Sequence, residues 1–166
     1  MQHQSRLLSD GSTALYAWFE AMHTRVDMLL RKKNQAPSSL LDTAEAVRAL
    51  LFRLEKAGNR FDPDSEISRL VDMPPGIAVK LSDDLYDMLR LAVHYYTVTE
   101  GLFDITVNTP GHTPQTMTEM ELSETERSCT LHQRGMVLDL SGFIKGYALD
   151  RIKPLLEAHG ICDTLI

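Results

Sequence analysis

The residues with the clearest chemical potential lie in the stretch VLDLSGFIKGYALDR, residues 137–151. A strand-like apolar run is interrupted there by Ser141 and Gly142, and the chain then continues around Lys145 and Gly146 into a helical pattern. A glycine-rich turn at a helix N-terminus offers backbone N–H groups to a phosphate, and the lysine adds a cation. The stretch is a candidate phosphate turn, although both glycines would equally suit a plain strand-to-helix turn with a solvated lysine.

A second acidic position is Asp104, in the sequence FDIT, where a helix connects to a following segment. An aspartate there can accept hydrogen bonds from backbone N–H groups, a ribose hydroxyl or an adenine amino group. Asp64 and Glu66, in DSEIS, have the positions of a helix N-cap and a first-turn charge. The six histidines show no paired metal spacing, and we interpret them as surface or core residues.

The composition indicates one soluble, folded domain. The chain has 166 residues, of which 43% are apolar and 24% charged, so it is neither disordered, collagen-like nor membrane-spanning. A formal net charge of −6 argues against broad contact with nucleic acid or anionic lipid. The N-terminal residues show no export leader and no lipid-accepting cysteine, which predicts a cytoplasmic protein, or a periplasmic one if a leader was removed.

The two cysteines, Cys129 and Cys162, lie far apart in the sequence and neither has a CxxC partner. They therefore indicate neither a zinc site nor a disulfide framework. We expect both to be reduced core or strand residues.

Three amphipathic helices should position the candidate residues. Residues 38–58 carry apolar side chains at alternating spacings of four and three, between a serine N-cap and a C-terminal glycine. A second helix follows Ser82, whose hydroxyl can cap the free N–H groups, and a third runs from about Ser141 to Gly160.

Strands are expected on both sides of the third helix and near the N-terminus. Residues 16–30 alternate aromatic or branched side chains with polar ones, which predicts a strand or hairpin. GMVLDL, residues 135–140, and GICDTLI, residues 160–166, are predicted to be strands of the same sheet. Residues 108–126 show no period and predict a mobile loop with at most one short strand.

Four short motifs carry a family resemblance: FEAMHT, FDPDSEISRL, GLFDITV and LDLSGFIKGYALDR, in this order and separated by two amphipathic helices. Together they resemble the N-terminal and central part of the FAD:protein FMN transferase family, often called the ApbE family. The resemblance begins at about Phe19 and implies an α+β fold, with a mixed or antiparallel sheet and amphipathic helices packed on it. Residues 1–166 then correspond to a single domain, an incomplete or shortened FMN-transferase-like domain.

The resemblance implies that FAD binds in a cleft and that, with magnesium (Mg²⁺), FMN moves from FAD to a threonine of an acceptor protein with release of AMP. The backbone carbonyl of Ile144 falls where the family offers one magnesium ligand, and the family's aspartate and threonine ligands have no counterpart up to Ile166. The residues implied to lie at the flavin nucleotide are Met22, Leu102, Phe103, Asp104, Asp139, Ser141 and Lys145.

Three departures from the family pattern are His23 in place of a glycine, Phe61 in place of a tyrosine, and Val71 in place of an asparagine. Three functions therefore stay open: an FMN transferase completed by further sequence or a partner, a non-catalytic flavin-binding module, and a scaffold or partner protein that kept only the fold. Met22 equally suits core packing. An open sheet edge after the last strand predicts a homo-oligomer or pairing with a complementing segment.

Overall fold

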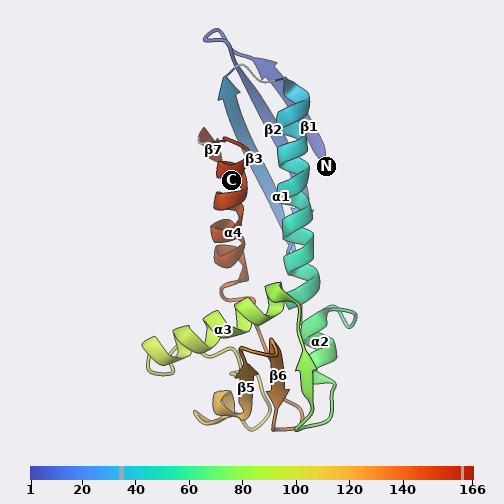
Figure 1. Ribbon diagram of the computed structural model, residues 1–166, viewed down its shortest axis with the longest axis vertical. Helices are drawn as coiled ribbons and strands as arrows, with labels where there is room; N and C mark the ends of the chain where they lie inside the picture. The colour runs from blue at the N-terminus through green and yellow to red at the C-terminus, as the bar shows by residue number, and fades with distance from the viewer. Residues whose placement is uncertain (34–35, 162) are drawn as a thin grey trace. The chain divides into compact units, whose positions relative to one another are not determined.

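The structure is a computed structural model of the chain, and it describes residues 1–33, 36–161 and 163–166 (Figure 1). The chain folds into two compact units. Unit 1 consists of Met1–Arg53 and Gly146–Ile166, and unit 2 of Leu54–Lys145. Unit 2 is therefore a continuous stretch inserted between two parts of unit 1. None of the helices in the described part of the chain is long and apolar enough to cross a membrane.

Unit 1 contains a four-stranded antiparallel sheet in the order β1-β2-β3-β7. The period-two pattern of the sequence explains its two long strands, because in β2 every second side chain from Thr13 to Ala21 is buried. The strands are β1 (Gln2–Leu7), β2 (Ser12–Ala21), β3 (Thr24–Lys33) and β7 (Asp163–Leu165).

The turn between β2 and β3 is a two-residue hairpin formed by Met22 and His23, between the paired residues Ala21 and Thr24. Both turn residues have positive φ, 52° and 55°, which is the backbone that a tight hairpin with the right-handed sheet twist requires. The predicted hairpin over residues 16–30 is confirmed. A glycine would adopt this conformation more easily than His23 does.

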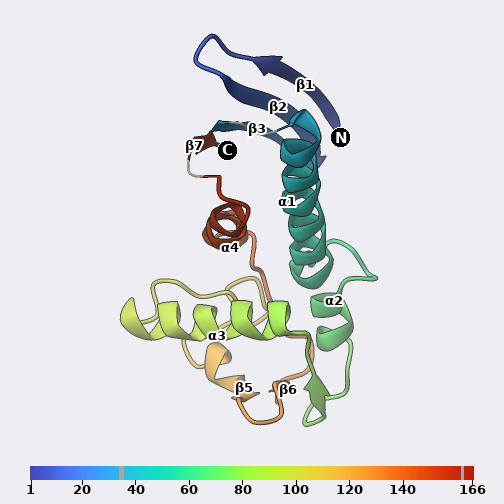
Figure 2. The ribbon, with the colours of Figure 1, turned by 45° about the horizontal axis from the view of Figure 1, so that its top comes forward.

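Two helices cover one face of this sheet, α1 (Pro37–Gly58) and α4 (Ile144–Ala158), as Figures 1 and 2 show. Both were predicted, but the serine N-cap expected for α1 is wrong: Ser38 and Ser39 lie inside the helix, which begins at Pro37. Their apolar stripes meet the inward side chains of the strands. The buried core of unit 1 includes Leu15, Ala17, Met28, Leu30, Leu40, Ala44, Val47, Ile152 and Leu156.

Unit 2 contains a three-stranded antiparallel sheet in the order β4-β6-β5, and α3 extends across it (Figure 2). As predicted, Ser82 caps α3, accepting a hydrogen bond from the Leu85 N–H at 3.2 Å. Glu66 in turn accepts from the Ser82 N–H at 2.6 Å, which ties α2 to α3. The elements are α2 (Glu66–Val71), β4 (Ala78–Lys80), α3 (Asp83–Val98), η1 (Thr116–Glu119), β5 (Met120–Ser123) and β6 (Ser128–Leu131).

The strand predicted over residues 135–140 is wrong, whereas β7 confirms a strand near the end of the chain but in a different sheet from the one predicted. Residues 136–140 form no strand, because their backbone groups bond to a neighbouring loop: the Val137 N–H donates to Thr109 Oγ1 at 2.9 Å. β7 pairs with β3, Leu165 opposite Leu29, in the four-stranded sheet of unit 1. The α+β class with antiparallel sheets is confirmed.

The secondary structure of residues 108–126 and the burial of Cys129 agree with the predictions. Residues 108–126 contain one short strand, β5, as predicted, and also the 3-10 helix η1, whose Thr116 and Met117 are buried. Cys129 lies buried in β6, where burial raises the pKa of its thiol to about 12. Cys162 lies outside the described residues.

Candidate functional site

Two of the sequence motifs lie against each other in unit 2. The Asp139 N–H of LDLSG donates to the Ile105 carbonyl of GLFDITV at 2.7 Å. The Asn108 side-chain amide donates to Asp139 Oδ2 at 2.8 Å, and Thr109 Oγ1 accepts from the Val137 N–H. We call residues 102–113 and 136–145 the paired loops, and they are the candidate site. The packing between them brings together acidic, aromatic and basic side chains that are far apart in the sequence.

Asp139 is the polar centre of the paired loops. Its Oδ1 accepts from the Ser141 N–H at 3.0 Å, and its Oδ2 lies 2.9 Å from Arg60 Nε in an ion pair. Burial alone would raise the pKa of Asp139, but the hydrogen bonds from Ser141, the charge of Arg60 and the amide of Asn108 outweigh it, and the net pKa is lowered. The carboxylate is therefore ionised at neutral pH.

Asp104 is held on both oxygens by its own loop. Its Oδ1 accepts from the Thr106 N–H at 2.7 Å and from the Thr106 hydroxyl at 2.6 Å. Its Oδ2 lies 2.8 Å from His112 Nε2, and only 7% of the Asp104 side chain is exposed. Burial alone would raise the pKa of Asp104, but the hydrogen bonds from Thr106 and His112 outweigh it, and the net pKa is lowered. The carboxylate is therefore ionised at neutral pH. The Asp104 carboxylate thus links Thr106 and His112 within the loop 104–112.

An aromatic cluster lies beside these carboxylates. Phe103 and Phe143 meet edge to face with ring centroids 5.7 Å apart, and Tyr95 of α3 contacts Phe103 and Phe143 at 5.6 and 6.2 Å. Such edge-to-face pairs stabilise an aromatic cluster beyond simple area burial. Leu102, directly before Phe103, is 92% exposed. The paired loops therefore present both apolar and charged surface.

The remaining residues implied by the resemblance differ in their exposure and in the unit to which they belong. Ser141 is exposed in the turn, and Lys145 is exposed in the first turn of α4. Ile144 buries its side chain, and its Cδ1 atom lies 2.9 Å from where a Cβ on Gly58 would sit. Met22 belongs to the hairpin turn of unit 1, so the structure does not bring it together with the other residues within one unit.

Three site residues were missed by sequence reasoning. Arg60 pairs with Asp139 and stacks on the Phe61 ring with its guanidinium carbon 4.2 Å from the centroid. Asn108 and His112 come from the loop that showed no period. The signal that would have found them is their position shortly after Asp104, in a segment rich in turn-forming residues.

The donor set for a metal is sparse. In residues 1–33, 36–161 and 163–166, no group of three or more His, Cys, Asp or Glu side chains could hold a metal ion. The Ile144 carbonyl is a single oxygen donor, whereas magnesium requires near-octahedral oxygen coordination. These residues do not by themselves fit a magnesium site.

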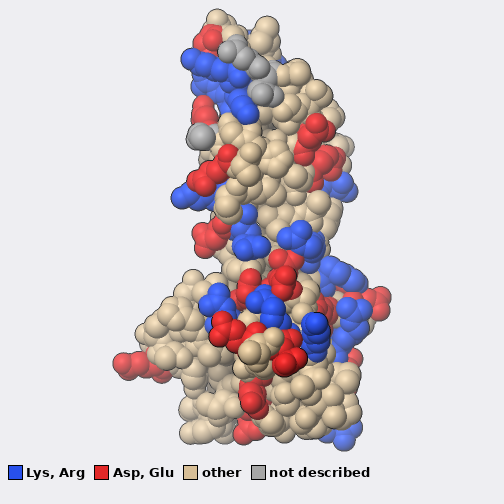
Figure 3. Space-filling view, in the orientation of Figure 1, with Lys and Arg blue, Asp and Glu red and all other residues tan. Residues whose placement is uncertain are grey.

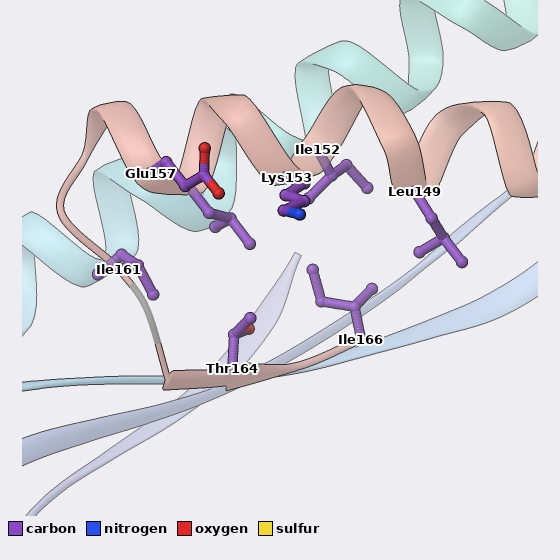
Figure 4. Close-up of a pocket in the computed structure, with 8 residues that line it drawn as sticks. Leu149, Ile152, Lys153, Glu157, Ile161, Thr164 and Ile166 are labelled. Carbon is purple, nitrogen blue, oxygen red and sulfur yellow. The ribbon is translucent and has the colours of Figure 1, made fainter.

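The surface features outside the paired loops are of two kinds. Basic and acidic side chains are intermixed over unit 2 on the face shown in Figure 3. In unit 1, a groove of about 390 Å³ lies between α4 and β7, with Leu149, Ile152 and Ile166 pointing into it (Figure 4). None of the residues implied at the flavin nucleotide lines this groove.

The ApbE family model matches residues 22–166. The chain belongs to the ApbE family. A curated relative, the FAD:protein FMN transferase of Klebsiella pneumoniae (strain 342), is 27% identical over 159 residues, which cover 92% of this chain and 48% of that protein. This ApbE-family chain therefore spans about half the length of the curated relative it matches.

Solved structures of the ApbE family share the fold. The flavin transferase ApbE from Vibrio cholerae matches with a TM-score of 0.78 at 15% identity, over 92% of this chain and 56% of that one. The flavinyl transferase ApbE from Pseudomonas stutzeri, in its apo form, matches with a TM-score of 0.76 at 18% identity, over 92% and 57%. The ApbE protein from Thermotoga maritima matches with a TM-score of 0.73 at 19% identity, over 88% and 53%.

Proposed function

We propose that this chain binds FAD and takes part in moving FMN from FAD to a threonine hydroxyl of an acceptor protein, with release of AMP. The observation that carries the proposal is the packing of GLFDITV against LDLSG in a chain of the ApbE family. Support comes from the matched relative, which is named for FMN transfer from FAD to protein.

Each part of the paired loops has a role in this proposal. Lys145, exposed in the first turn of α4, binds the diphosphate of FAD, because a cation at a helix N-terminus favours anions. Phe103 and Leu102 contact the apolar ring surfaces. Asp139, held ionised by Arg60, accepts hydrogen bonds from nucleotide hydroxyl or amino groups.

Magnesium would stabilise the charge that develops on the transferring phosphoryl group. The described residues offer the Ile144 carbonyl but no cluster of side-chain ligands, so no reaction step is assigned to magnesium in this chain. Any magnesium ligation at Ile144 would need further oxygen donors.

A second candidate function is a flavin-binding module without transfer. Phe61 supports it, because this residue is 63% exposed and brings no hydroxyl to the nucleotide. A scaffold role is the third possibility, and it would leave the paired loops without a flavin ligand.

The experiment titrates FAD into the purified 166-residue chain, by calorimetry and flavin fluorescence, with and without magnesium. Wild type should bind FAD, and the Asp104→Ala, Lys145→Ala double variant should bind it more weakly, because it lacks both the cation for the diphosphate and the carboxylate that holds the loop 104–112 through Thr106 and His112. Lys153→Ala is the matched control, because Lys153 lies on the same helix α4 and lines the groove of unit 1 instead. Equal affinity of wild type and the double variant would reject the paired loops as the site.

Product analysis separates the candidate functions. AMP release and a flavinylated acceptor, detected by chromatography and mass spectrometry, indicate transfer. FAD binding without AMP indicates the module. Neither binding nor AMP indicates the scaffold.

We propose in addition that β7, which ends the sheet order of unit 1, pairs with a further strand from a second copy or a complementing segment. All three β7 residues are exposed, and Leu165 is 71% exposed. Light scattering at micromolar concentration tests this, and a monodisperse monomer would contradict pairing with a second copy.

A further inference from the structure

The contact between His112 and Asp104 involves a histidine that none of the four sequence motifs contains. His112 Nε2 lies 2.8 Å from Asp104 Oδ2, and the imidazole is 25% exposed whereas the carboxylate is 7% exposed. The contact joins the two ends of the loop 104–112, whose middle carries Asn108 and its bond to Asp139. His112 therefore contacts the site from a loop position that the sequence motifs do not include.

We propose that His112 is a positioning residue of the flavin-nucleotide site, which holds Asp104 in place and, when protonated, cancels the charge of that carboxylate so that an anionic flavin nucleotide binds more tightly. This inference rests on the proposed function and deepens it. It makes FAD affinity dependent on pH and restricts that dependence to flavins that carry phosphate.

The electrostatic reason for this pH dependence is that Asp139 and Asp104 have different counter-charges. Asp139 has a permanent counter-charge in Arg60, 2.9 Å away. For Asp104, the described charge partner is His112. The backbone bond from Asp139 to Ile105 holds the two acidic segments side by side. A diphosphate that binds there meets a net negative charge from Asp104 unless His112 is protonated.

Imidazole is the side chain whose charge changes between pH 5 and 8. With a neutral imidazole, Nε2–H donates to Asp104 and the pair carries one negative charge. With a protonated imidazole the contact is an ion pair and the net charge is zero. Because linkage is reciprocal, a nucleotide that binds better to the protonated pair must also favour proton uptake by it.

The other charged or titratable groups around the loop leave this argument unchanged. Arg60 is committed to Asp139, and the Tyr96 hydroxyl of α3 donates to the Pro114 carbonyl at 2.6 Å. The direct ion-pair partner that the structure assigns to His112 is Asp104. Protonation of His112 therefore acts first on Asp104.

The test measures the dissociation constant of FAD at pH 5.5 and pH 8.0. Cancelling the unit charge of Asp104, at several Å from the diphosphate in a site partly open to water, corresponds to about a fivefold change in FAD affinity. Wild type should bind FAD about fivefold more tightly at pH 5.5. Riboflavin, which has the same ring and no phosphate, should bind equally at both pH values.

Two variants separate charge from structure. His112→Gln keeps an N–H donor for Asp104 but cannot be protonated, so its FAD affinity should be the same at both pH values. His159→Gln is the matched control, because this exposed histidine bonds to the Leu155 carbonyl of α4 in unit 1 and should leave the wild-type pH dependence intact. Thermal unfolding of each variant verifies its fold. Should His112→Gln not fold, the NMR titration of the His112 ring protons replaces it, and FAD should shift the midpoint to higher pH.

Three results would overturn the inference while leaving the proposed function standing: wild type binds FAD equally at both pH values, His112→Gln keeps the wild-type pH dependence, or riboflavin shows the same dependence as FAD. In the NMR titration, an unshifted midpoint has the same meaning. Absence of FAD binding by wild type at both pH values would overturn the proposed function itself, and the inference with it.

Discussion

Replacing Asp139 with alanine removes the acceptor shared by three groups of the paired loops. The Ser141 N–H, the Asn108 amide and the Arg60 guanidinium all lose their contact. Only 16% of the Asp139 side chain and 30% of the Arg60 side chain are exposed, so the pair is partly desolvated. At about 1 kcal/mol for each lost partner, the free energy of unfolding should fall by about 2–3 kcal/mol.

Thermal unfolding followed by circular dichroism measures this loss, and a decrease in Tm of about 5–10 °C is expected. Asp163→Ala is the matched control. It removes another aspartate–arginine pair, to Arg31 at 3.4 Å, but the Asp163 side chain is 71% exposed, so its loss should cost less than about 0.5 kcal/mol. If both variants lose the same small amount, then Asp139 does not hold the paired loops together.

Three further perturbations test the packing, capping and charge of unit 2. Gly58→Ala places a Cβ 2.9 Å from Ile144 Cδ1 and should lower the stability to denaturant by about 1–2 kcal/mol, whereas Gly146→Ala, with open space around it, should not lower it. Ser82→Ala removes the cap of α3 and should cost about 1 kcal/mol in the same assay, and an unchanged midpoint would refute the cap. The pKa of Asp139 is lowered in the folded chain, so its contribution to stability is complete above about pH 5 and is lost as the pH falls below about 4. Urea unfolding at pH 6 and pH 3 should therefore show a smaller acid-induced loss for Asp139→Asn than for wild type, and equal losses would contradict this assignment.

The elements that were predicted correctly carry strong local signals. α3 begins at Ser82 because a serine hydroxyl followed by two aspartates satisfies the free N–H groups of a helix N-terminus. The hairpin of β2 and β3 follows from the alternation of residues 16–30. In both cases the residues that determine the element lie within it or next to it.

The wrong predictions concern segments whose partners are distant in sequence. Residues 136–140 have a strand-like composition, but Thr109 takes up the Val137 N–H and Ile105 the Asp139 N–H, so no ladder forms. β7 pairs with β3, more than a hundred residues earlier in the chain, and its three residues carry too little pattern to select a partner.

The candidate site was half predictable for the same reason. The motifs located Asp104, Asp139 and Phe103, which the fold brings together. They could not identify Arg60, because an arginine after a helix has no sequence signature, and the signal for His112 was limited to its position shortly after Asp104 in a turn-rich segment. Only tertiary packing gives these two side chains their carboxylate partners.

The insertion of unit 2 into unit 1 has a consequence for the order of folding. Unit 1 needs contacts between Met1–Arg53 and Gly146–Ile166, and closing so long a stretch of chain costs on the order of 4 kcal/mol in entropy. Within unit 2, the packing of Ile144 against Gly58 holds the two ends of that stretch next to each other. Because folding of unit 2 already brings the ends of this stretch together, little further entropy is lost when β7 pairs with β3. The intervening residues then act like a short loop.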